Sequence, residues 1–211
     1  MFDYLFAQYK EYPIHEVYLE LIGVFFGLCS VWYAKKDSIW VFPTGLISTS
    51  IYAYLLWQWS LLGDSMINVY YFIMSIYGWY HWTRKKDNTD EFPISTMNGK
   101  DRVIAVIFFT LTIVFVVVVY LYFNKFTIWY SYLDTLLTAI FFVGMWLMAK
   151  RKIENWIFWI IGDLLSIPLY FAKGYTFTSF QYIIFTIIAV YGFLEWKKIL
   201  NSSQNLELRQ L

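Results

Sequence analysis

The chain has 211 residues, of which 60% are hydrophobic and 15% are charged, whereas an ordinary soluble domain has about 45–50% and about 25%. A soluble fold of this length could not hide so much apolar surface from water, so the composition indicates an integral membrane protein. The net charge of +1 gives no field that would attract nucleic acid. The single cysteine, Cys29, excludes a disulfide framework and a cysteine-based metal site.

The N-terminal residues 1–16 do not resemble a cleavable signal peptide. They read MFDYLFAQYKEYPIHE, with acidic and aromatic residues in place of a basic stretch followed by an apolar one. We therefore expect residues 1–16 to form an interfacial segment at the membrane surface.

Seven apolar stretches follow, and each approaches the roughly 20 residues that a membrane-spanning helix needs. The fourth stretch contains no charged residue, whereas the sixth is short and contains Asp163 and Pro168. The fold class expected from this pattern is an all-α membrane protein with seven transmembrane helices. The predicted spans are 17–34, 39–57, 66–82, 103–123, 129–149, 156–171 and 180–196.

Lysine and arginine separate between the two sides of the predicted membrane. Cytoplasmic loops carry the excess of these residues, and only Lys10, Lys125 and Lys173 fall on the other side. Seven spans with this alternation place the N-terminus outside and the C-terminus in the cytoplasm. The basic residues on the predicted inner side are Lys35, Lys36, Arg84, Lys85, Lys86, Lys100, Arg102, Lys150, Arg151, Lys152, Lys197, Lys198 and Arg209.

The ends of the third and seventh spans resemble each other. One reads YGWYHW and the other YGFLEW, and they align when Trp82 is laid on Trp196, at an offset of 114 residues. Pairing Gly45 with Gly162 gives an offset of 117, which predicts a loop three residues shorter in the second copy. Alternatively, the two ends share only a common helix-ending pattern.

A duplication with one extra helix between the copies gives a 3+1+3 parallel repeat, as in SWEET transporters, whose substrate sites lie between the repeats. The expected division is a first three-helix repeat at 17–82, a cytoplasmic loop at 83–102 and a linker helix at 103–123. The second three-helix repeat then occupies 129–196, and a cytoplasmic tail occupies 197–211.

Several polar side chains fall inside the predicted spans, where they are costly unless they face a protein interior or a water-filled path. Asp163 lies about 13 Å into the sixth span, close to the middle of a hydrocarbon core about 30 Å thick. Each of these residues could instead make a structural hydrogen bond between helices. The others are Glu20, Asn68, Asp134, Gln181 and Tyr182.

Two tryptophans precede Asp163 at helical spacing. Trp156, Trp159 and Asp163 share one helix face, so the indoles could stack on a flat, positively charged ring while the carboxylate supplies the counter-charge. Alternatively, the tryptophans belong to the aromatic belt at the inner membrane interface. Asn68, Tyr71 and Ser75 form a comparable stripe on the third span. This stripe serves either hydrogen bonding to a ligand or packing.

The residues give no sign of catalysis or of metal binding. There is no GxxxxGK[ST] motif for ATP. Neither His15 nor His81 has a nucleophile partner or a metal-ligand spacing, and the last span holds no lysine that could bind retinal. We therefore expect no enzyme activity, no catalytic residues, no cofactor, no metal and no nucleic-acid partner.

Four stretches of the chain resemble the PnuC family of bacterial vitamin transporters, which includes nicotinamide riboside transporters. They are KRKIENWIFWIIGDLLSIPLYFAKG, FQYIIFTIIAVYG, NVYYFIMSIYGWYHW and the helix that begins near Asp134. The resemblance implies that Trp156 and Trp159 contact the substrate, and we expect Asp163, Asn68, Tyr71, Tyr182 and Asp134 to complete the substrate-binding set.

The resemblance also implies a 3+1+3 helix arrangement in the bacterial inner membrane and a homotrimer. Uptake is then passive facilitated diffusion, made one-way by a cytoplasmic kinase that phosphorylates the vitamin for pyridine nucleotide biosynthesis. The expected partners are the vitamin, the lipid bilayer, other copies of the chain and, functionally, that kinase.

Two positions depart from the family pattern. Asp163 stands where nicotinamide riboside transporters carry asparagine, and Asn68 stands where they carry glutamine. An asparagine can donate to and accept from an amide, whereas an ionised aspartate only accepts. A carboxylate also suits thiamine, another flat cation that relatives of this fold carry, whereas neutral riboflavin is the poorest match. The sequence therefore favours nicotinamide riboside and leaves thiamine open.

Two other classes of protein remain as alternatives. A seven-helix sensor would bind a ligand without passing it, although the tail NSSQNLELRQL is too short for a signalling domain. An intramembrane enzyme would need a nucleophile and base at matched depth. Ion coupling through Glu20 or Asp134 also stays open.

Overall fold

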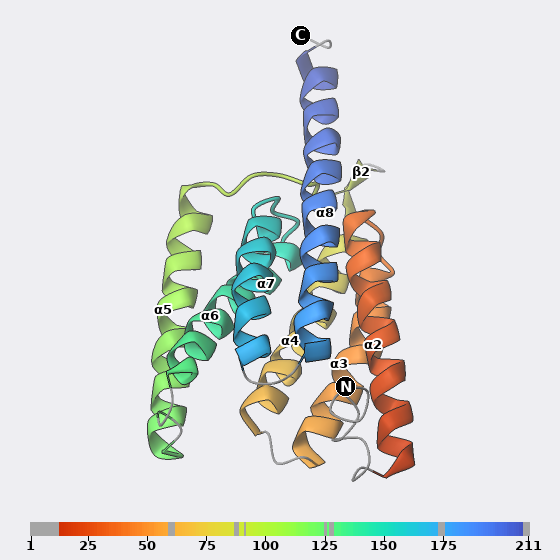
Figure 1. The fold of residues 1–211 in the computed structure, drawn as a ribbon. Helices are drawn as coiled ribbons and strands as arrows, with labels where there is room; N and C mark the ends of the chain where they lie inside the picture. The colour runs from red at the N-terminus through yellow and green to blue at the C-terminus, as the bar shows by residue number, and fades with distance from the viewer. Residues whose placement is uncertain are drawn as a thin grey trace. The chain divides into compact units, whose positions relative to one another are not determined.

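The computed structural model describes residues 13–58, 62–86, 89–90, 92–124, 126, 129–172 and 176–208. These residues form seven helices and one pair of two-residue antiparallel strands (Figure 1), which confirms the all-helical expectation. The elements are α2 (Ile14–Lys35), α3 (Val41–Gln58), α4 (Leu62–Thr83), β1 (Lys85–Lys86), β2 (Thr89–Asp90), α5 (Gly99–Tyr122), α6 (Tyr130–Ala149), α7 (Asn155–Ala172) and α8 (Thr176–Leu208).

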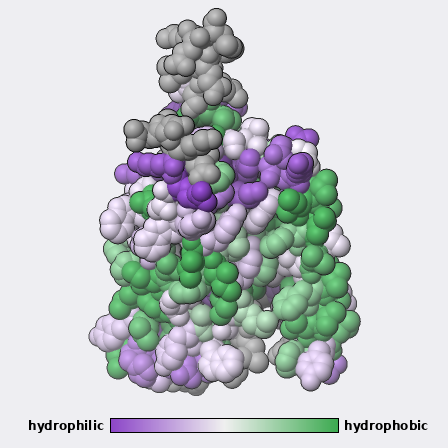
Figure 2. All heavy atoms as spheres, turned by 180° about the vertical axis from the view of Figure 1, so that it is seen from behind, coloured by the Kyte–Doolittle hydropathy of each residue, from purple (hydrophilic) through white to green (hydrophobic). Residues whose placement is uncertain are grey.

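Four of the described helices are long and apolar enough to cross a membrane, namely α2, α5, α6 and α7. The most apolar is α5, with a mean hydropathy of 3.0. Its side chains Val106 and Leu111 are more than half exposed, and hydrophobic residues cover much of the visible helix surface (Figure 2). Exposed apolar sides of this kind suit a lipid environment, and membrane spanning by α3, α4 and α8 stays a prediction.

The chain divides into two compact units, Met1–Thr83 and Arg84–Leu211. In the first unit, α3 packs against both α2 and α4. In the second, α6 packs against α5 and α7, and α7 packs against α8. Buried residues make up 61% of the apolar window of α6 but 17% of that of α5, so α6 is the core helix of its unit.

Both units contain the same pair of edge-on aromatic rings. In the first unit, the Phe42 and Trp82 rings lie 5.0 Å apart at 88°. In the second, the Trp156 and Trp196 rings lie 5.6 Å apart at 89°. Each ring of one pair is separated from its counterpart by 114 residues. The last two helices of each unit, α3 and α4 in the first and α7 and α8 in the second, therefore pack through equivalent positions.

The hydrogen bonds between these helices repeat at the same offset. Ser65 Oγ donates to the Ala53 carbonyl at 2.9 Å, and Ser179 Oγ donates to the Ile167 carbonyl at 2.8 Å. Between Phe42 and Trp82, each residue of these matched contacts therefore lies 114 positions before its counterpart in the second copy.

The turns that precede α3 and α7 also correspond. Asp37 and Arg151 both adopt the left-handed conformation, with φ of 51° and 52°. The next amides, of Ser38 and Lys152, each donate to a carbonyl five residues back in the chain.

The expected pairing of Gly45 with Gly162 is therefore wrong. At an offset of 114, the counterpart of Gly45 is Trp159, and that of Gly162 is Ser48. Because the offset is 114 at every matched contact, the two copies have the same length between these contacts, and the expected three-residue shortening is absent.

Several predicted boundaries shift in the structure, and α5 begins at Gly99, inside the loop expected at 83–102. The helix α8 continues to Leu208, so most of the tail at 197–211 is helical, and this part projects past the other helices of its unit (Figure 1). The helix α2 begins at Ile14, inside the expected interfacial segment at 1–16. Residues 1–12 and 209–211, and with them Lys10 and Arg209, lie outside the described residues, as do Lys125 and Lys173.

Candidate ligand-binding site

The start of α7 is fixed by its preceding turn. Arg151 turns the chain with a left-handed backbone conformation, and Asn155 Nδ2 donates to the Lys152 carbonyl at 2.6 Å. Asn155 is fully buried. This short polar connection begins a helix that carries Trp156, Trp159 and Asp163 within its first nine residues.

Trp156 is buried between α7 and α8. Only 1% of its surface is exposed, and its ring packs edge-on against Trp196. Gly192 allows this approach, because a Cβ at that position would lie 2.6 Å from atoms of the Trp156 ring. The Trp156 Nε1 is a buried donor that has no hydrogen-bond partner among the described residues.

Trp159 contacts α6 instead. Its half-buried ring stacks on Phe141 at a centroid distance of 5.5 Å and an angle of 30°. Gly144 lies against the same stretch of α7, since a Cβ there would lie 3.3 Å from the Phe158 Cβ and in ordinary contact with the indole at 3.5 Å. The two tryptophans thus start from one stretch of α7 and contact different neighbouring helices.

Asp163 lies one helical turn beyond Trp159 and is 3% exposed. Its neighbour Gly162 brings α7 close to α6, because a Cβ at that position would overlap the Phe141 ring. Ser166 lies a further turn along and is fully buried, and its Oγ has no hydrogen-bond partner among the described residues. A carboxylate and a hydroxyl are therefore both buried on one side of α7.

Tyr182 connects α8 to the same group of rings. It is half-buried and lies nearly parallel to Phe141 at 6.3 Å and 13°. Tyr182 also stacks with Tyr170, with the ring centroids 5.1 Å apart and an angle of 28° between the rings. The rings of Trp159, Phe141, Tyr182 and Tyr170 form what we call the aromatic row, which joins α6, α7 and α8.

This arrangement has the chemistry to hold a flat, polar ligand. Aromatic faces stack on planar rings and attract cations. A buried carboxylate is stabilised only when a cation or hydrogen-bond donors meet it. The aromatic row and Asp163 supply these two features in one unit.

The remaining predicted residues lie elsewhere. Asp134 is half-buried in α6, and its carbonyl accepts a hydrogen bond from Thr138 Oγ1 at 2.8 Å. Asn68 and Tyr71 are half-buried on α4, in the first unit. The roles of these three residues in a site stay predictions.

Sequence reasoning missed Phe141, Tyr170 and Ser166. Phe141 and Tyr170 sit in apolar runs that look like ordinary core. The available signal was Gly144 and Gly162, because glycine inside an apolar helix often marks a close approach of another group.

Two further features lie apart from this site. A groove of about 420 Å³ between α5 and α6 is lined mainly by apolar residues, including Ile113, Val117 and Leu136, and by none of the predicted site residues. Among the described residues, no three histidine, cysteine, aspartate or glutamate side chains lie close enough to hold a metal ion.

Long apolar helices with exposed apolar sides define a multi-pass helical membrane protein. Residues 17–198 match the family described as nicotinamide mononucleotide transporter. The chain therefore belongs to this family of membrane transporters.

Individual relatives agree over most of their length. The chain is 24% identical to the nicotinamide riboside transporter PnuC of Escherichia coli (strain K12), covering 92% of this chain and 90% of that protein. It is 26% identical to the riboflavin/roseoflavin transporter RibM of Streptomyces davaonensis, covering 86% and 85%. Its fold is similar to the crystal structure of the vitamin B3 transporter PnuC, with a TM-score of 0.65, 23% identity, and coverage of 88% of this chain and 83% of that one.

Proposed function

We propose that this protein takes up nicotinamide riboside across the bacterial inner membrane. Membership of the transporter family carries the general part of the proposal, and the similarity to nicotinamide riboside transporters favours this vitamin. Movement is facilitated diffusion, and phosphorylation by a cytoplasmic kinase traps the product inside.

The chemistry of the second unit supports this ligand class. Nicotinamide riboside carries a flat pyridinium ring, a carboxamide and ribose hydroxyls. The aromatic row offers a stacking surface, and Asp163 offers a buried carboxylate. The Trp156 Nε1 offers a donor that has no partner within the described part of the chain. Asn68, Tyr71 and Asp134 complete the proposed contacts.

The proposed architecture is a 3+1+3 parallel repeat that assembles as a homotrimer. The matching ring pairs and hydrogen bonds of the two units support the duplication. The distribution of lysine and arginine supports an N-terminus outside and a C-terminus in the cytoplasm.

A second substrate is favoured by one residue. Asp163 stands in the site where an asparagine would suit a carboxamide better, and a carboxylate pairs well with the thiazolium cation of thiamine. Riboflavin is a third ligand to test, because RibM is similar over most of the chain.

The deciding experiment is parallel titration of the purified protein with nicotinamide riboside, thiamine and riboflavin. We expect saturable binding of nicotinamide riboside with the highest affinity. Tighter binding of thiamine or riboflavin would replace the proposed substrate.

Two variants test the site. Trp159→Ala should abolish saturable binding while the protein stays folded, and wild-type affinity in this variant would contradict the site. Asp163→Asn should weaken binding of thiamine clearly, but it should leave nicotinamide riboside binding unchanged or improved.

Flux into liposomes separates a transporter from a sensor, because only a transporter moves the bound vitamin to the other side. Uptake should be insensitive to an imposed proton or sodium gradient. A gradient-dependent rate would instead assign a coupling role to a group such as Glu20 or Asp134.

A further inference from the structure

The segment 92–101 is fastened to the turn 150–154 that precedes α7. The backbone pairing is that of a parallel bridge: the Ser95 amide donates to the Arg151 carbonyl at 3.1 Å, and the Ile153 amide donates to the Ser95 carbonyl at 3.0 Å. Segments about 55 residues apart in the chain are thereby joined directly ahead of the proposed site. We call this connection the loop clamp.

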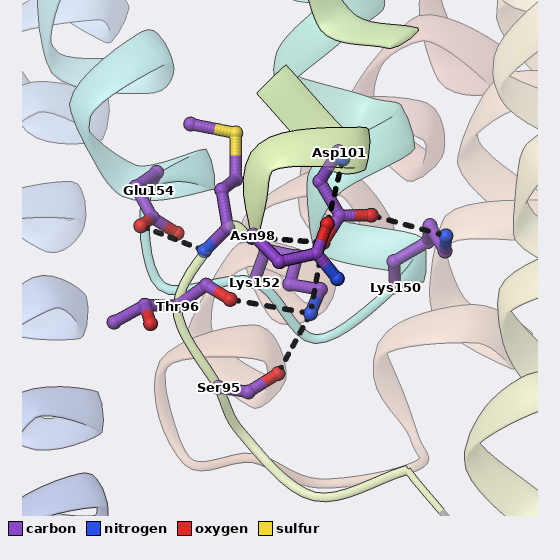
Figure 3. Close-up of polar contacts among 8 residues, drawn as sticks. Ser95, Thr96, Asn98, Asp101, Lys150, Lys152 and Glu154 are labelled. Atoms are coloured by element: carbon purple, nitrogen blue, oxygen red, sulfur yellow. Dashed lines mark hydrogen bonds and ion pairs between the residues drawn. The ribbon is translucent and has the colours of Figure 1, made fainter. Parts of the chain in front are cut away.

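Charged side chains close the loop clamp (Figure 3). Lys152 Nζ lies 3.2 Å from Asp101 Oδ2, and it donates to Ser95 Oγ at 3.0 Å and to the Thr96 carbonyl at 3.3 Å. Lys150 Nζ approaches the other oxygen of Asp101 at 3.4 Å. The Lys152 and Asp101 side chains are only 14% and 5% exposed, so this ion pair is shielded from solvent and is stronger than a surface pair.

Two more residues of the turn bind the same segment. Glu154 Oε1 accepts a hydrogen bond from the Met97 amide at 2.9 Å, and Arg151 Nη1 donates to the Phe92 carbonyl at 3.2 Å. Every charged side chain of the turn 150–154 therefore contacts segment 92–101.

The first unit has the same turn without the charges of Lys152 and Glu154, although Lys36 and Asp37 stand at the positions of Lys150 and Arg151. At the offset of 114, the counterparts of Lys152 and Glu154 are Ser38 and Trp40, neither of which can form an ion pair. The backbone of the turn is thus set by its own hydrogen bonds in both units. The charges of Lys152 and Glu154 are therefore not required for the turn to form.

The loop clamp acts where α7 begins. Asn155 Nδ2 donates to the carbonyl of Lys152, and Trp156 follows directly in the chain. A shift of the turn would therefore move the first turn of α7 and the indole that packs into α8. Binding groups keep their geometry only when neighbouring contacts hold them.

We propose that Lys152 and Asp101 are positioning residues, whose ion pair holds the start of α7 so that the Trp156 and Trp159 rings are placed for the ligand. The inference rests on the proposed function for the identity of that ligand. Neither residue touches the ligand itself. Their removal loosens the site without removing any of its groups.

The test measures nicotinamide riboside binding by calorimetry on monodisperse Lys152→Met and Asp101→Asn proteins. Asp101→Asn keeps an oxygen that can accept from the Asn98 amide, as Asp101 does in the capping box of α5, so the helix cap survives while the charge is lost. We expect the dissociation constant to rise about two- to thirtyfold, the range for coupling through a packed network, with unchanged stoichiometry.

Two further variants sharpen the result. Lys152→Arg retains the ion pair and should restore wild-type affinity. Lys198→Met removes an ion pair of equal length, 3.2 Å to Glu195, whose side chains are 71% and 45% exposed, and it should leave the affinity unchanged.

A purely structural role predicts a different outcome, in which the number of binding sites falls while the remaining protein binds with wild-type affinity. That outcome, or an unchanged dissociation constant in both variants, would overturn the proposal. If the wild-type protein does not bind nicotinamide riboside, the proposed function fails instead. In that case, hydrogen exchange in residues 153–160 tests whether the loop clamp holds the start of α7. Exchange should be faster in Lys152→Met than in Lys198→Met, and equal rates would overturn the proposal.

Discussion

Trp156 combines a packing role with a polar group that packing does not use. Phe42 makes the equivalent edge-on contact in the first unit without any N–H group, so the contact requires a ring and not an indole. A buried donor left without a partner costs about 1–3 kcal/mol, and the Trp156 Nε1 is such a donor among the described residues. The indole nitrogen therefore carries a hydrogen-bonding capacity that the ring contact does not require.

We expect Trp156→Phe to leave the fold intact and to weaken nicotinamide riboside binding. The first unit demonstrates that phenylalanine packs at this position. The loss of one hydrogen bond, about 0.5–1.5 kcal/mol, corresponds to a roughly two- to twelvefold rise in the dissociation constant. Calorimetry measures the affinity and thermal unfolding measures the fold. Trp82→Phe is the matched control, and an equal loss of affinity in both variants would contradict a role for the nitrogen.

One contact between neighbouring helices has its glycine on the first helix in the first unit and on the second helix in the second unit. Gly27 in α2 faces Ser48 in α3, whereas their counterparts in the second unit are Phe141 and Gly162. The second unit carries a large ring on the first helix of this pair and a glycine on the second, whereas both residues are small in the first unit. This exchange builds the aromatic row in the second unit alone.

We expect Gly162→Ala to displace the Phe141 ring, since the added Cβ would overlap it. Forcing an extra methyl group into a packed core costs about 1–3 kcal/mol. Thermal unfolding should therefore shift downward, and ligand affinity should fall because Trp159 loses its stacking partner. Gly99→Ala is the control, because nothing lies within 4 Å of a Cβ at that position. An unchanged affinity in Gly162→Ala would remove Phe141 from the site.

At the level of helices, one hydrogen bond ties the last two helices of each unit together. Ser65 and Ser179 both reach across to a backbone carbonyl of the preceding helix. Both serines are almost fully buried. Hydrogen bonds of this kind contribute about 0.6 kcal/mol on average between membrane helices.

Ser65→Ala and Ser179→Ala should each lower the stability by about 0.6 kcal/mol, measured as unfolding in mixed micelles. The double variant should show the sum, because the bonds belong to separate units. Ser50→Ala serves as the control, since Ser50 bonds to a carbonyl of its own helix. A loss confined to one of the two serines would contradict their equivalence.

The sequence predicts the helices well, because apolar runs bounded by charges determine where they lie. It fails at the end of α8, where a polar stretch continues the helix to Leu208. The repeat offset of 114 is visible in the tryptophan motif. The glycine pairing misleads because the two glycines leave space for different side chains, Ser30 beside Gly45 and Phe141 beside Gly162.

Within the site, helical spacing predicts that Trp156, Trp159 and Asp163 belong together. It does not predict that the two indoles contact different helices. The loop clamp escapes prediction entirely, because its pairing joins residues such as Ser95 and Lys152 through the fold and not through a local pattern.

At the scale of the whole molecule, charge distribution determines the expected orientation in the membrane. Basic residues gather at the ends of α2, α4, α6 and in the last part of α8, and such residues remain in the cytoplasm. Ser202 lies in the last part of α8, so α6, α7 and most of α8 lie between it and Phe123 in the chain. If α6, α7 and the part of α8 before Ser202 each cross the membrane, these two positions lie on opposite sides of it.

Single-cysteine labelling tests this orientation. In a Cys29→Ser background, which removes the native cysteine, we expect Phe123→Cys to react with a membrane-impermeant maleimide in right-side-out vesicles. Ser202→Cys should react only after the vesicles are opened. Both native side chains are exposed, so access to reagent depends on the membrane and not on burial. The reverse pattern would invert the orientation, and labelling of both positions from one side would require an even number of spans between them.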